Sequence, residues 1–130
     1  MDFTSAETRF LEKNEIARLA TISYDGMLHV VPVSYVFKDN LFLIAVDYET
    51  KKYRNRLRNN QVALVVDTLS PNRGIMVQGH SEIFEKGSEF RRAYRIFHRR
   101  LSWVRADPWK EGEAPFIRVK PVKKATWGFR

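Results

Sequence analysis

The chain has no cysteine, so it can form no disulfide and offers no thiolate as a metal ligand or nucleophile. Long hydrophobic runs are also missing. The longest unbroken apolar stretch is Leu41–Val46, far below the roughly 18 residues that a membrane-spanning helix needs. Residues Met1–Thr8 carry no apolar block of the kind found in a secretory signal peptide. We therefore expect a cytoplasmic protein without a membrane segment, with residues 1–130 forming one globular domain.

Several chemical motifs are absent as well. Neither common glycine-rich phosphate loop is present, and the segment 79–82 (GHSE) lacks the second glycine of a nucleophile elbow. The histidines are His29, His80 and His98, and no two of them have the spacing of metal ligands on one helix face. We expect no metal site, and the sequence identifies no catalytic residue. His29 and His80 fall on expected strands and are interpreted as hydrogen-bonded barrel residues.

Acidic residues are in the minority, with 15 Asp and Glu against 23 Lys and Arg and a formal net charge of +8. Segment 50–58 has five positive charges and no acid, and a hydroxyl residue followed by lysines at a helix start is typical of a phosphate site. Segment 89–110 has seven basic and two acidic residues. No nucleic-acid recognition motif accompanies it, so we interpret it as a solvated face or the rim of an anionic ligand site.

Turn signals divide the chain into short β-rich runs. Turns are expected at Asp25-Gly26, Asp39-Asn40 and Pro71–Gly74. Pro32 has no backbone amide hydrogen, so an edge or a bulge is expected there. Leu41–Val46 is expected to be buried on both faces. The expected strands are Ile16–Tyr24, Met27–Phe37, Leu41–Val46, Gln61–Thr68, Ile75–Phe84, Phe116–Lys120 and Lys123–Phe129, the last two on either side of Pro121.

Three helices complete the prediction. Each has, close to its start, a residue whose hydroxyl can cap its first turn. The helices, with their expected caps, are Phe3–Asn14 (Thr4 or Ser5), Thr50–Asn60 (Thr50) and Glu89–Arg105 (Ser88). An apolar stripe on the third consists of Phe90, Tyr94, Phe97, Leu101 and Val104. Six or seven strands joined by consecutive hairpins favour an antiparallel barrel, not an alternation of strands and helices.

Ten short segments, spread in order along almost the whole chain, form a recognisable pattern when they are taken together. They are 18–21 (RLAT), Asp25-Gly26, 29–33 (HVVPV), 46–52 (VDYETKK), Arg54-Asn55, Asn59, 62–64 (VAL), 77–79 (VQG), Lys120-Pro121 and Trp127-Gly128. Together they resemble the pyridoxamine 5′-phosphate oxidase-like split-barrel flavoproteins. The resemblance implies a mainly β fold, a six-stranded antiparallel split β-barrel with flanking helices. It also implies a homodimer with two flavin sites at its interface.

Cofactor-binding residues implied by the resemblance fall into three groups. Thr50 and Lys52 hold the cofactor phosphate, with Lys51 assisting. Val31, Pro32, Val33 and Ser34 run beside the isoalloxazine ring, and Ala45 and Val46 line the ring or the ribityl chain. Further candidates for the rim are Arg73, Gly74, Gln78 and Trp127. No catalytic acid or base is implied, because hydride transfer by a flavin requires none.

The resemblance implies FMN as the cofactor of an oxidoreductase that acts on a small molecule by hydride transfer. A deazaflavin coenzyme is the alternative, because small members of the family use either one. Vitamin B6 oxidation is not expected, since Val31–Val36 has no Arg or Lys where the true oxidases hold their substrate. A non-catalytic module that binds flavin, or less favourably haem, stays open. A basic nucleic-acid-binding protein is the least favoured alternative.

Overall fold

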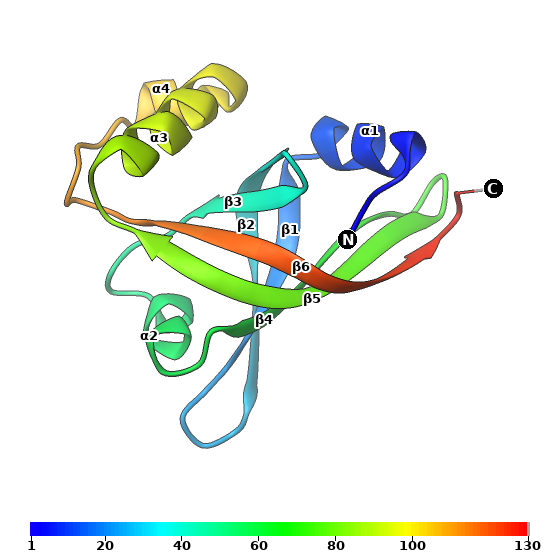
Figure 1. Cartoon of the computed structure of the whole chain (residues 1–130), viewed down its shortest axis with the longest axis horizontal. Coiled ribbons are helices and arrows are strands. Elements are labelled where there is room, and N and C mark those ends of the chain that lie inside the picture. Colours follow the sequence, from blue (N-terminus) through cyan, green and yellow to red (C-terminus); the bar gives the residue numbers. More distant parts are fainter. Residues whose placement is uncertain (130) are drawn as a thin grey trace.

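The structure is a computed structural model that describes residues 1–129. Its six strands form a closed antiparallel barrel in the order β1-β2-β3-β6-β5-β4, which confirms the predicted fold class (Figure 1). The strands are β1 (Ile16–Ile22), β2 (Leu28–Lys38), β3 (Leu41–Ala45), β4 (Gln61–Thr68), β5 (Arg73–Phe84) and β6 (Phe116–Trp127). The helices are α1 (Ser5–Lys13), α2 (Lys51–Arg58), α3 (Ser88–Arg100) and α4 (Ser102–Ala106). No helix within residues 1–129 is both long and apolar enough to cross a membrane.

Strand β2 has two halves with different neighbours. From Leu28 to Ser34 it pairs with β1 alone, whereas Tyr35–Lys38 pairs with β3. Pro32 lies in the first half, opposite Arg18 of β1. Its missing amide hydrogen therefore costs no ladder hydrogen bond on the open side. This confirms the edge position predicted from Pro32.

The region around Pro121 differs from the prediction. Residues Phe116–Trp127 form one continuous strand, so the prediction of two strands separated by a break was wrong. The register between β5 and β6 shifts at Gln78/Gly79, where Gly79 faces Pro121. This irregularity accommodates a residue without an amide hydrogen, because a bulge removes one position from the regular ladder.

The long basic helix was also predicted incorrectly at both ends. Gly87, not Ser88, occupies the N-cap position, and α3 ends at Arg100 because Leu101 is extended. The chain resumes as α4 at Ser102. A guanidinium from α4, that of Arg105, hydrogen-bonds to the carbonyls of His98 and Arg99, which the end of α3 leaves without helical partners.

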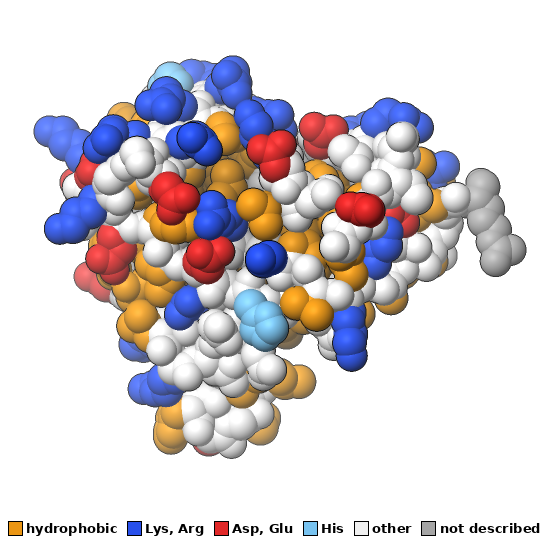
Figure 2. Space-filling model, in the orientation of Figure 1, with side chains coloured by type: hydrophobic (Ala, Val, Ile, Leu, Met, Phe, Trp, Pro, Cys, Tyr) orange, Lys and Arg blue, Asp and Glu red, His pale blue; other side chains and the backbone are white. Residues whose placement is uncertain are grey.

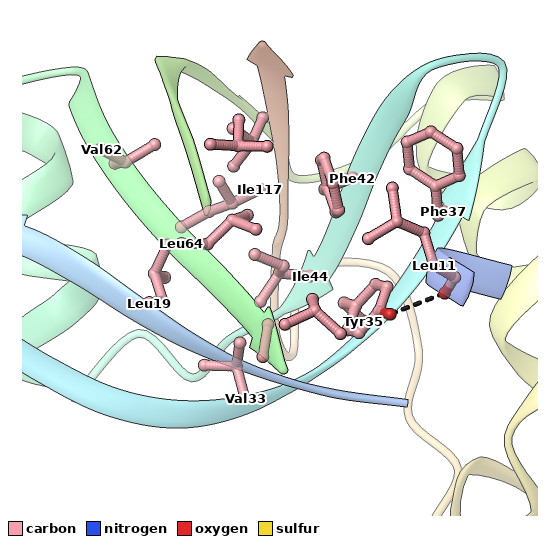
Figure 3. Close-up of a cluster of buried hydrophobic side chains, with 14 of the residues drawn as sticks. Leu11, Leu19, Val33, Tyr35, Phe37, Phe42, Ile44, Val62, Leu64 and Ile117 are labelled. Atoms are coloured by element: carbon pink, nitrogen blue, oxygen red, sulfur yellow. Dashed lines mark hydrogen bonds between the residues drawn. The ribbon is translucent and has the colours of Figure 1, made fainter. Parts of the chain in front are cut away.

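The barrel interior is filled from every strand and from α1. Figure 3 shows inward-facing side chains of the barrel strands and of α1 meeting in one cluster. Phe42 is fully buried and its ring lies 4.9 Å from that of Phe37. The Tyr35 hydroxyl donates a 2.6 Å hydrogen bond to the Leu11 carbonyl, drawn as a dashed line in Figure 3. Burial, and then the charge of Glu15, raise the pKa of Tyr35. This neutral hydroxyl therefore fastens α1 to β2.

A second apolar cluster lies beneath α3 and α4. Phe90 and Phe97 of α3 pack on Phe116, with ring centroids 5.1 Å and 4.9 Å apart. Leu101 and Val104 are buried beside them. The apolar stripe predicted for this segment is thus confirmed. It holds the two helices over one end of the barrel, at the upper left of Figure 1.

Helix α1 is anchored to β6 by a buried ion pair. Thr4 and Glu7 form a capping box, which confirms Thr4 as the cap. Glu7 also lies 2.5 Å from Lys124 Nζ and is 5% exposed. Burial opposes the charge of Glu7, but the hydrogen bonds from Lys124 and Thr4 outweigh it and lower the pKa below 4.5. The ionised carboxylate therefore stabilises the folded state.

Acidification should release this stabilisation. The pKa of Glu7 is lower in the folded state than in the unfolded state, where it is near 4.5. The ionised carboxylate therefore stabilises the folded state at pH values above about 4.5, and this stabilisation is lost as the pH falls through the folded-state pKa. Glu7→Gln should cost about 2 kcal/mol at pH 7 and much less near pH 3. Urea unfolding at several pH values measures the difference. The matched control is Glu12→Gln, exposed on the same helix; an equal pH dependence in both variants would contradict the assignment.

Candidate cofactor-binding site

The pairing between strands β2 and β3 ends where the resemblance places the cofactor ring; this point of separation is called the parting of β2 and β3. Their last aligned pair is Tyr35 opposite Ile44, so one further step would set Ser34 opposite Ala45. The structure therefore brings Val31–Ser34 and Ala45–Val46 to the same parting of the sheet. Val33 and Val46 are buried and Pro32 is exposed. One edge of β2 is left open beside an apolar wall.

Helix α2 begins a few residues beyond this parting. Thr50 occupies the predicted N-cap position. Its hydroxyl, however, donates a 2.7 Å hydrogen bond to the Asp47 carbonyl and makes no cap bond to the helix. The predicted side-chain cap is therefore wrong, because the hydroxyl is used in the preceding turn. The first-turn amides keep no side-chain acceptor, and no acid lies in that turn.

Lys51 and Lys52 are the first two residues of α2. Lys51 is exposed and Lys52 is half-buried. Neither forms a salt bridge with any residue in the described part of the chain. Helix amides and two lysines without acidic partners make this terminus electrostatically suited to a phosphate.

Two buried contacts fix the position of α2. Asn55 donates hydrogen bonds to Thr21 Oγ1 (3.0 Å) and Ser23 Oγ (3.4 Å) at the end of β1. On its other side, the Tyr53 hydroxyl donates to Glu85 Oε1 at 3.2 Å. Burial and the Glu85 carboxylate raise the pKa of Tyr53. These contacts hold α2 between the end of β1 and Glu85, which follows β5.

The rim candidates lie elsewhere in the same chain. Trp127 pairs with Gly74 near the far end of the β5–β6 ladder, at the right of Figure 1, whereas α2 lies at the left. Arg73 adjoins Gly74 there and stacks on the Phe129 ring at 5.6 Å. Gln78 is exposed on the outside of the barrel. One chain alone therefore does not gather the rim candidates with the phosphate-site residues.

Gln78 belongs to a groove on the outer wall, with a volume of about 390 Å³. Exposed apolar side chains in and beside it include Leu28 (74%), Val30 (59%) and Val122 (50%). The lining residues are Ala20, Thr21, Ile22, Leu28, Gln61, Val62, Ala63, Gln78, Gly79, His80, Val122 and Lys123. The groove thus draws on five strands.

Two histidines lie in surroundings that the sequence did not indicate. The interpretation of His29 as hydrogen-bonded is wrong for Nδ1, which is buried without a hydrogen-bond partner among residues 1–129. His29 lies on the open half of β2, on the same side as Val31 and Val33. His80 is exposed in the outer groove. Only the position of His29 two residues before Val31 could have drawn attention to it.

A comparison with known families decides the classification. The family model described as pyridoxamine 5′-phosphate oxidase matches residues 3–128. The chain belongs to this family. The match spans the barrel, the parting of β2 and β3, and α2, so the resemblance seen in the sequence is confirmed.

Similarity to individual family members spans nearly the whole chain. A Streptomyces rimosus protein named 5a,11a-dehydrotetracycline/5a,11a-dehydrooxytetracycline reductase is 28% identical, covering 98% of this chain and 84% of the relative. HutZ, the haem storage protein from Vibrio cholerae, superposes with a TM-score of 0.79 at 15% identity, covering 98% and 94% of the two chains. An F420 reductase superposes with a TM-score of 0.74 at 22% identity, covering 95% and 98%. The two solved structures share the fold.

Proposed function

We propose that this protein is a flavin-dependent reductase that binds FMN beside the open half of β2. One observation carries the proposal. The uncapped start of α2, with Lys51 and Lys52, directly follows the parting of β2 and β3. A phosphate and a flat ring system attached to it would therefore meet complementary surfaces at one place. The name of the Streptomyces rimosus relative supports a reductase.

The residues at this site fit a flavin chemically. The amides of α2 and the two lysines supply positive charge for the phosphate, which carries nearly two negative charges at neutral pH. Val31 and Val33 supply an apolar flank for the ring. His29 Nδ1, buried without a partner among the described residues, is available to a polar atom of the ligand. A bound flavin would supply hydride transfer; the chain itself binds and orients the cofactor and its substrate.

A second copy of the chain would complete the site. The outer wall exposes Leu28, Val30 and Val122, and an uncovered apolar face of this kind is typical of an association surface. We propose that a homodimer through this wall brings the rim candidates of one copy toward the phosphate site of the other. That arrangement accounts for the separation of Trp127 from Lys52 within one chain.

Dimer formation can be tested independently of cofactor binding. Val30→Glu places a charge in the apolar wall, and we expect it to convert a dimeric wild type to monomers in light scattering. Leu69→Glu is the matched control, because Leu69 is 89% exposed and lies outside the groove. It should leave the dimer intact. A monomeric wild-type protein would refute the homodimer.

The cofactor is tested by an absorbance spectrum of the purified protein, followed by titration with FMN and with the deazaflavin coenzyme. We expect a flavin band near about 450 nm or saturable FMN binding at about one per chain. Tighter binding of the deazaflavin would replace FMN with the alternative coenzyme. A haem band, or no binding of either flavin, would refute the proposed function.

A further inference from the structure

The outer face of α3 carries a band of arginines. Because successive helical residues are rotated by about 100°, positions 91, 92, 95 and 99 fall within roughly a third of the helix circumference. The buried residues Phe90, Ala93 and Phe97 occupy the opposite side. Figure 2 shows Lys and Arg side chains gathered at the upper left, over α3 and α4. We name Arg91, Arg92, Arg95 and Arg99 the arginine stripe; along the helix axis it spans about 12 Å.

Most of this charge is uncompensated. Arg91 forms a 3.0 Å salt bridge with Glu111. No salt bridge to Arg92, Arg95 or Arg99 occurs anywhere in residues 1–129. All three side chains are exposed. Unpaired like charges on one helix face repel each other, so an anionic partner that neutralises them would be bound favourably.

Aromatic side chains flank the stripe. Tyr94 and His98 are one helical turn apart on its edge, with ring centroids 6.2 Å apart. The Tyr94 ring meets Trp109 edge-on at 4.9 Å. Trp109 in turn stacks on Trp103 of α4 at 5.9 Å and an interplanar angle of 10°. Trp103 is 39% exposed, so the row ends in an indole that a flat group can reach.

We propose that this face of α3 and α4 binds single-stranded nucleic acid. Arginine contacts phosphate through two parallel hydrogen bonds, and an exposed aromatic ring stacks on an unpaired base. The arginine stripe supplies the first element, and Trp103 supplies the second at the end of the aromatic row that begins at Tyr94. An acidic peptide would engage the arginines but would leave the indole without a stacking partner. The combination therefore favours a strand that carries both phosphates and bases.

Fluorescence anisotropy of a labelled 12-nucleotide oligothymidylate tests the charge component. Three or four phosphate contacts predict a slope of log K against log salt of about −2 to −3. Arg95→Gln with Arg99→Gln should make the slope less negative by about 1.4. The control, Arg9→Gln with Lys13→Gln, removes the same charge from exposed positions on α1. Equal losses in the two double variants would overturn the assignment to α3.

Replacing Trp103 tests the stacking component. Trp103→Ala should weaken oligothymidylate binding about five-fold or more with no change in slope. Thermal unfolding of each variant establishes that it is folded, and Trp127→Ala is the control for losing an exposed indole (40% exposed). An unchanged affinity in Trp103→Ala would overturn the proposal. So would an oligoglutamate of equal charge that displaces the oligothymidylate at the same concentration.

Discussion

Lys52→Ala is expected to weaken FMN binding about ten- to a hundred-fold, while leaving folding nearly intact. The reason is that a charge-assisted hydrogen bond to phosphate contributes roughly 1.5–3 kcal/mol. Lys52 is half-buried at the start of α2 and has no acidic partner among the described residues. Its removal therefore breaks no ion pair within that part of the protein. FMN fluorescence titration measures the loss, and chemical unfolding should agree with wild type within about 0.5 kcal/mol.

The control for this variant is Lys13→Ala. Lys13 is exposed at the end of α1, which Figure 1 places across the barrel from α2. The Lys13→Ala substitution removes the same charge without changing the proposed phosphate site. Comparable weakening in both variants would mean that overall charge, not α2, attracts the cofactor. Unchanged affinity in Lys52→Ala would place the phosphate elsewhere.

Gly79→Ala is expected to lower the free energy of unfolding by about 3 kcal/mol, because the new methyl group would collide with backbone. A Cβ on Gly79 would lie 2.2 Å from the Lys120 carbonyl oxygen and 3.2 Å from Pro121 Cα. Neither atom can move without separating β5 from β6 at the register shift. Urea unfolding monitored by tryptophan fluorescence measures the change.

Gly74→Ala is the matched comparison on the same strand. Its Cβ would meet the Trp127 ring at 1.9 Å, a closer approach than at Gly79. Trp127 is 40% exposed, so its side chain can turn toward solvent. We therefore expect a smaller loss, about 1–2 kcal/mol. A larger loss in Gly74→Ala than in Gly79→Ala would contradict the argument that an immobile backbone makes the difference.

Local sequence signals predicted those elements whose stabilising contacts are also local. Strand β4 has the predicted bounds, and Thr4 caps α1 as expected. The prediction failed where distant contacts decide. Pro121 was expected to break the strand. It does not, because the register shift opposite Gly79 accommodates it, and Gly79 is remote in sequence. Helix α3 ends at Arg100 because Leu101 has an extended backbone, and the regular spacing of apolar residues continues past that point without showing it.

Predictability of the site follows the same division. Thr50, Lys51 and Lys52 are consecutive, so a local motif is enough to indicate a phosphate site. The outer groove could not be foreseen, because its walls come from five strands and residues as distant as Ala20 and Val122. The prediction for His29 failed because hydrogen-bond satisfaction depends on neighbours that the sequence does not show.

The position of β6 in the barrel sets the order in which this protein can be completed. Among residues 1–129, β6 comes last in sequence, yet it lies between β3 and β5; Phe42, for example, pairs with Val119. A nascent chain on the ribosome therefore carries two open strand edges until residues 116–127 emerge. Such edges can pair with other chains, and long-range pairing slows folding. Aggregation should compete with folding in that interval, and the arrival of β6 ends it.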